Sequence, residues 1–177
     1  MFRVSLKRES VEILSKSVIF AIILYYISDY LFLRSATAEH TSYLLGLIGI
    51  EVPVDYDGSV IHLGPYLVSR NCAIIGALAI IYATILAIKA DWKKKVKSMI
   101  FIFPILYIFN ILRLVIAYKL MDIGYSFFWA HDLPANLSGI LLGISLFYIL
   151  DPFLPEFKVQ FLEVFDDLEK NIRRVMG

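Results

Sequence analysis

Four apolar stretches constrain this chain more than any other feature. They cover residues 17–33, 73–88, 98–118 and 133–150. A hydrocarbon core about 30 Å thick needs about 20 mostly apolar residues in a helix that rises about 1.5 Å per residue. Composition agrees, since 59% of the residues are hydrophobic and 19% are charged, against about 45–50% and about 25% in soluble domains. The sequence predicts an all-α membrane protein built as a four-span helical bundle.

The distribution of positive charge orients these spans. Cations gather before the first span and, as five lysines within residues 89–97, between the second and third spans. Residues 36–70 hold one cation and four carboxylates. By the positive-inside rule, both termini and the lysine loop are cytoplasmic, and segments 34–71 and 119–132 face outward. The formal net charge of +1 gives no electrostatic case for nucleic acid as a partner.

The N-terminal 33 residues allow two interpretations. The pattern Ala36-Thr37-Ala38 follows a basic and then an apolar stretch, as in a secretory signal peptide. The apolar run 17–33 is longer than the usual core of such a peptide, about 7–15 residues, and this length favours a retained anchor. Whether residues 1–33 are retained or cleaved stays open, and the sidedness of the later spans is the same in both cases.

Two segments outside the spans have their own patterns. Residues 43–50 are apolar but too short to cross a bilayer, so we expect them in the interface. Asp57-Gly58 between residues 52–56 and 59–63 predicts an outward-facing β-hairpin. Beyond residue 150, apolar residues recur at spacings of three and four, which predicts a cytoplasmic amphipathic helix. The predicted organisation is therefore a membrane domain over residues 1–150 and a cytoplasmic tail over residues 151–177.

Three chemically active side chains are expected at one depth, near the outer surface. Cys72 stands at the outer mouth of the second span, and His131 precedes the fourth. Arg113 lies 14 residues beyond Met99, about 21 Å along the third span. Asn110 shares the helix face of Arg113, three residues earlier. Ionisable groups at membrane depth are costly and therefore point to function.

These groups suffice for acyl transfer. A thiolate attacks a carbonyl, an imidazole moves the proton, and a guanidinium stabilises the oxyanion. The sequence thus nominates Cys72, Arg113 and His131 as catalytic, with Asn110 in support. A single cysteine excludes an intrachain disulfide and a paired-cysteine metal site, and we expect no cofactor or metal. In the alternative, a non-enzymatic four-span scaffold or transporter subunit, Arg113 and Asn110 make an interhelical contact and Cys72 is inert packing.

The chain resembles the exosortase/archaeosortase family of integral-membrane cysteine transpeptidases over roughly residues 17–150. Cys72 with Gly76, the run Asn110-Ile111-Leu112-Arg113, and His131 before the last span carry the resemblance, together with the outer stretch SYLLGLIGIEV. The resemblance implies a nucleophilic Cys72, an oxyanion-stabilising Arg113 and an acid/base His131. It also implies partners: membrane-anchored surface proteins with a C-terminal sorting signal, which are cut outside the cell membrane and passed to a lipid or amine acceptor.

Overall fold

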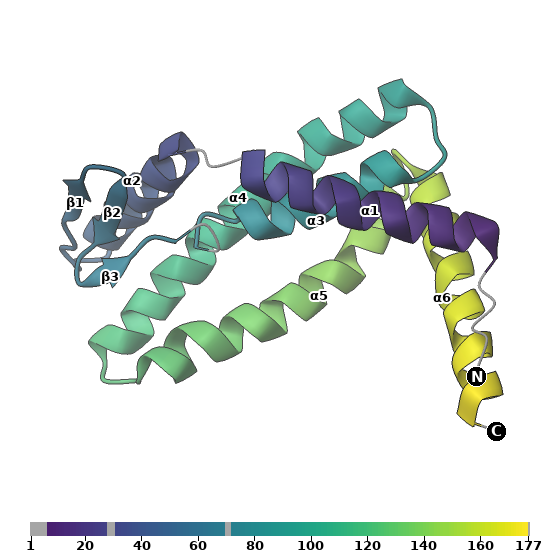
Figure 1. Cartoon of the computed structure of the whole chain (residues 1–177). Coiled ribbons are helices and arrows are strands. Elements are labelled where there is room, and N and C mark those ends of the chain that lie inside the picture. The colour runs from purple at the N-terminus through teal and green to yellow at the C-terminus, as the bar shows by residue number, and fades with distance from the viewer. Residues whose placement is uncertain (1–6, 28–30, 70–71, 177) are drawn as a thin grey trace.

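The computed structural model describes residues 7–27, 31–69 and 72–176, and the chain is mostly helical (Figure 1). Six α-helices, one π-helical turn and a small three-stranded sheet make up the described part. In chain order they are α1 (Arg8–Ile27), α2 (Leu31–Leu47), β1 (Val54–Asp57), β2 (Val60–Leu63), β3 (Tyr66–Leu67), α3 (Ile75–Ala87), α4 (Trp92–Asp122), η1 (Phe128–Asp132), α5 (Leu133–Leu150) and α6 (Pro155–Met176).

Three of the described helical segments are long and apolar enough to cross a membrane: α1, α4 and the continuous stretch Phe128–Leu150. The chain is therefore an all-α membrane protein in its spanning part, as expected. The predicted count of four spans is not confirmed, because α3 has only 13 residues and is about 20 Å long. The second expected span, 73–88, is thus a short apolar helix that begins after a turn at Cys72–Ile74.

The boundaries predicted for the first span were wrong. Helix α1 begins at Arg8 and ends at Ile27, and residues 31–33 already belong to α2; residues 28–30 lie outside the described part. The additional first turns of α1 are charged, and two of their carboxylates form ion pairs. Lys16 pairs with Glu12 one turn away at 2.6 Å, and Glu9 pairs with Lys89 at 2.8 Å.

Helix α2 and the sheet form a cap at one end of the helices (Figure 1). Residues 43–47, expected as part of an interfacial segment, are the last turn of α2. The predicted hairpin is confirmed, with its turn shifted by one residue: Asp57 pairs with Val60, so Gly58 and Ser59 form the turn and Gly58 adopts a φ of 57°. The hydroxyl of Tyr118 on α4 donates to the Leu63 carbonyl and ties the sheet to the bundle.

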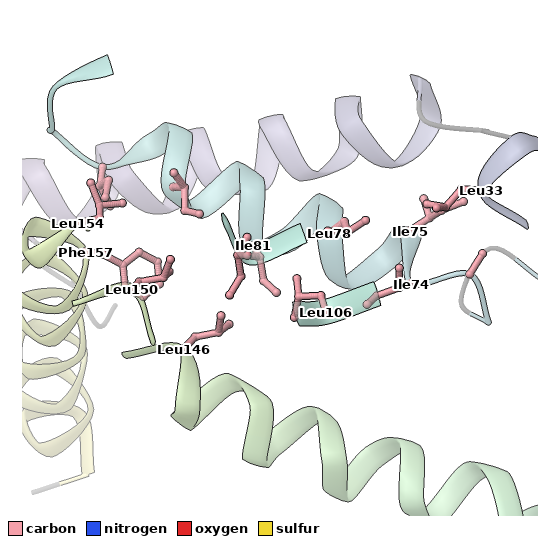
Figure 2. Close-up of a cluster of buried hydrophobic side chains, with 14 residues drawn as sticks. Leu33, Ile74, Ile75, Leu78, Ile81, Leu106, Leu146, Leu150, Leu154 and Phe157 are labelled. Carbon is pink, nitrogen blue, oxygen red and sulfur yellow. The ribbon is translucent and has the colours of Figure 1, made fainter. Parts of the chain in front are cut away.

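The bundle core runs along α3, which is apolar on all sides. Figure 2 shows the buried cluster extending from Leu33 at one end of α3, past Leu78 and Ile81, to Leu154 and Phe157 at the other. Because α3 has neighbours on several faces, α1 and α4 among them, it packs as a core helix. Its apolar residues are therefore mostly covered by protein, whereas the longer helices keep large exposed apolar faces.

The amphipathic C-terminal helix is present as α6. Phe157 and Val164 are buried on its inner face, and charged residues such as Glu163 and Lys170 are exposed. Buried Asp167 accepts a hydrogen bond of 2.7 Å from the Lys7 backbone, which joins α6 to the start of the chain. Helix α6 and the first turn of α1 lie at the end of the bundle opposite the sheet (Figure 1).

Candidate active site

Cys72 lies in the turn that leads from the sheet into α3. Ile74 closes this turn in the left-handed conformation, with φ 63° and ψ 0°. Such a conformation is an outlier for a β-branched residue, and backbone strain of this kind gathers at functional sites. Ile74 is almost completely buried, so packing holds the strained turn. The result places the Cys72 thiol just before the N-terminus of α3, where a thiolate is stabilised.

Polar contacts fix the cysteine on two sides. The Ser69 hydroxyl lies 3.3 Å from Cys72 Sγ and 3.3 Å from the Cys72 backbone nitrogen, from which it accepts a hydrogen bond. On the other side, Asn110 Nδ2 donates to the Cys72 carbonyl at 2.6 Å. Asn110 is buried, so this bond is protected from water and anchors the turn to α4.

Arg113 reaches the same turn through Asn110. Its Nη2 donates to Asn110 Oδ1 at 3.2 Å, and its charge interacts electrostatically with both Cys72 and His131. The guanidinium lines a cavity of about 160 Å³ between α3, α4 and α5. This cavity does not include the thiol, so Arg113 approaches the cysteine from the side opposite the sheet.

His131 lies in η1, the π-helical turn that opens α5. Its Nδ1 is 2.9 Å from Asp132 Oδ1, and its ring stacks on Phe127 with centroids 4.6 Å apart. The other nitrogen, Nε2, is buried and has no partner in full hydrogen-bonding geometry. Because Nδ1 is held by a carboxylate, it carries the proton in the neutral ring, and the lone pair is on Nε2.

The His131 imidazole and the Cys72 thiol share one cavity of about 230 Å³. Burial raises the pKa of Cys72, but polar contacts with His131 and Ser69 outweigh it and lower the pKa from 9.0 to about 7. His131 Nε2 has no partner within strict hydrogen-bond geometry, so the imidazole acts on the thiol as a close polar neighbour in the same cavity. A substantial part of the thiol is therefore ionised near neutral pH.

The walls of this cavity are mainly apolar and aromatic. Tyr66 of β3 stacks on Phe127 with centroids 5.5 Å apart and meets Tyr118 of α4 edge to face. The full lining is Leu63, Tyr66, Leu67, Val68, Cys72, Leu114, Tyr118, Met121, Phe127 and His131. The sheet thus forms one wall of a mainly apolar cavity beside the thiol.

The structure brings the four nominated residues to one end of the bundle: Cys72 and His131 in one cavity, and Arg113 behind the cysteine through Asn110. Sequence reasoning missed Ser69 and Asp132. Their only signal is position, since Ser69 precedes the cysteine by three residues and Asp132 follows the histidine directly. Within residues 7–27, 31–69 and 72–176 there is no cluster of three His, Cys, Asp or Glu side chains that could hold a metal ion.

Comparison with known proteins gives a family. The family model described as transmembrane exosortase matches residues 5–150. The chain therefore belongs to the transmembrane exosortase family. No curated protein and no solved structure matches. Family membership supports a transpeptidase-type function at a membrane and the processing of proteins that carry sorting signals.

Proposed function

We propose that this protein is a membrane-embedded cysteine transpeptidase that cuts the C-terminal sorting signal of surface proteins and passes the product to a lipid or amine acceptor. The observation that carries the proposal is the shared cavity of Cys72 and His131, in which the pKa of the thiol is lowered to about 7. A structural cysteine in apolar surroundings would have a raised pKa instead.

In the first half-reaction, His131 Nε2 takes the proton of the Cys72 thiol, and the resulting thiolate attacks the carbonyl carbon of the scissile peptide bond and forms a tetrahedral oxyanion. When the oxyanion collapses, the carbon–nitrogen bond breaks, and the leaving amine takes a proton from His131 Nε2. The acyl part of the substrate stays on Cys72 as a thioester. The carboxylate of Asp132 at Nδ1 stabilises the imidazolium that exists before this proton is given up.

The second half-reaction reverses these roles. An amine or a lipid hydroxyl loses its proton to His131 and attacks the thioester carbon, and a second oxyanion collapses with release of the Cys72 thiolate. In this proposal the Arg113 guanidinium, which lines the neighbouring cavity in the structure, turns toward Cys72 when substrate binds and stabilises both oxyanions. A guanidinium suits this role because it keeps its charge at low dielectric and donates in a planar fork. Asn110 positions it, since it accepts from Nη2 and also holds the Cys72 backbone.

We propose that the site faces outward and that both termini are cytoplasmic, which requires the short apolar helix α3 to cross the membrane as the fourth span. The basic residues near the start of α1, in the loop before α4 and in the first turns of α4 lie away from the sheet, which agrees with the positive-inside rule. The sheet and α2 would then cover the cavity on the outer surface, where surface proteins arrive. Helix α6 would lie along the cytoplasmic side with its charged face in water.

The function is tested in the cells that encode this chain by exchanging the gene for a Cys72→Ala variant. We expect precursors that retain a C-terminal hydrophobic helix and basic cluster to accumulate in the membrane fraction, detected by mass spectrometry of their C-terminal peptides. His62→Ala, a histidine of β2 outside the cavity, serves as the matched control and should process normally. Normal processing in the Cys72→Ala strain would exclude the proposed chemistry and return the chain to the scaffold alternative.

A further inference from the structure

A second binding surface lies at the N-terminal end of α4. Asn110 and Arg113, the residues that connect α4 to the candidate active site, lie further along the same helix. It is an open groove of about 550 Å³ lined by Trp92, Lys93, Val96, Lys97, Ile100, Phe101 and Phe153. The rings of Phe101 and Phe153 form its floor, with centroids 4.4 Å apart. Trp92 is 62% exposed and Ile100 is 69% exposed, so the groove opens to the outside of the bundle.

Two of the five lysines in residues 89–97, Lys93 and Lys97, line this groove. The other three have partners: Lys89 with Glu9 at 2.8 Å, Lys94 with Glu156 at 2.5 Å, and Lys95 Nζ with the Leu86 carbonyl at 2.8 Å. Within the described part of the chain, neither Lys93 nor Lys97 pairs with a carboxylate. The Lys97 ammonium lies 5.2 Å from the centroid of the Phe153 ring, at the rim of the apolar floor.

We propose that this groove binds one anionic phospholipid. Lys93 and Lys97 are one turn apart on the same helix face, so their like charges repel, and a phosphodiester between them removes that repulsion. Ile100 and Phe101 lie about 10–12 Å further along α4 than Lys93, where an acyl chain would run. The phosphate headgroup thus matches the lysine end of the groove, and the acyl chain matches its apolar end. Trp92 is a residue of the type enriched at membrane interfaces.

The bound lipid sets the depth of α4 in the bilayer. Arg113 follows Lys93 by 20 residues, which is about 30 Å of helix and about the thickness of the hydrocarbon core. A phosphate fixed at Lys93 therefore holds Arg113 at the opposite boundary. This inference does not depend on the proposed reaction, because it concerns a surface at the other end of the helix.

Fluorescence of Trp92 tests the proposal directly. The chain has two tryptophans, so a Trp129→Phe background leaves Trp92 as the only reporter. The protein is placed in nanodiscs of zwitterionic phospholipid that contain a small, equal fraction of either brominated anionic or brominated zwitterionic phospholipid. We expect the anionic lipid to quench Trp92 more strongly, with a relative affinity of about fivefold per lysine.

Matched lysine variants decide the outcome. Lys93→Gln/Lys97→Gln should bring quenching by the two lipids to the same level, while Lys93→Arg/Lys97→Arg should keep the difference. Lys89→Gln/Lys94→Gln removes the same charge from lysines that already have partners, and it should also keep the difference. Equal quenching in the parent, or equal loss in both glutamine pairs, would overturn the proposal. Displacement of the brominated anionic lipid by millimolar inorganic phosphate would likewise overturn it, in favour of a soluble-anion site.

Discussion

Replacing His131 by alanine should change the ionisation of Cys72 in a way that can be calculated. The contact with the His131 imidazole is the largest influence that lowers the pKa of the thiol, and burial opposes it. Without the imidazole, we expect the pKa to return from about 7 to near its ordinary value of 9.0. The thiolate fraction at pH 7 then falls from about one half to about 1%, roughly a 50-fold loss.

The observed rate falls by less, because a thiolate of higher pKa is a stronger nucleophile. With a Brønsted slope of about 0.45, two pKa units raise the reactivity of each thiolate about eightfold. We therefore expect a net decrease of about sixfold at pH 7, and a higher plateau than in the parent above pH 9. The midpoint of the pH–rate profile, near pH 7 in the parent and near pH 9 in the variant, is the decisive quantity.

The assay is exchange with an aromatic disulfide in nanodiscs, followed by absorbance from pH 5 to pH 10. Since Cys72 is the only cysteine, every signal comes from it. His62→Ala should keep the parent midpoint, because His62 is not part of the cavity lining. Superimposable profiles for the parent and His131→Ala would refute the claim that the imidazole activates the thiol.

Three further predictions concern the groups around the thiol. Asp132→Asn removes the carboxylate at 2.9 Å from His131 Nδ1 and should raise the midpoint of the same profile by about one pH unit; an unchanged midpoint would make the contact incidental. Arg113→Lys keeps the charge but loses the planar fork, so processing of precursors in cells should fall by about 10²-fold or more, and full processing would leave Arg113 a structural role only. Asn110→Leu removes two hydrogen bonds and should lower the free energy of unfolding by about 2–4 kcal/mol, which is measured as a Tm several degrees lower in detergent. Asn136→Leu, at an exposed asparagine, is the control. Equal Tm values for both variants would contradict the anchoring role of Asn110.

Much of the fold follows from the sequence because membrane burial leaves a simple pattern. The apolar runs locate α4 and α5, and Gly58 locates the hairpin. The apolar run does not predict the start of α1, because the first turns of this helix are charged. Glu12 pairs there with Lys16, and Glu9 pairs with Lys89. The helix α2 was missed because its sequence mixes polar and apolar residues, and its packing on the sheet and on α4 is a tertiary property.

The candidate active site, too, could be predicted only in part from the sequence. Depth along each span was enough to nominate Cys72, Arg113 and His131, and helical spacing was enough to place Asn110 beside Arg113. The role of Ser69 depends on how the turn before α3 brings its hydroxyl back to the thiol. The strained conformation at Ile74 in the same turn likewise has no local signal in the sequence.

The most direct test of the account is capture of the thioester on Cys72. An epitope-tagged protein is purified rapidly from cells at mildly acidic pH, digested, and analysed by mass spectrometry with and without neutral hydroxylamine. The account predicts a peptide adduct on Cys72 that hydroxylamine removes and that is absent in His131→Ala. Processing of sorting-signal precursors with no acyl adduct on Cys72, or with an adduct that persists unchanged in His131→Ala, would contradict it.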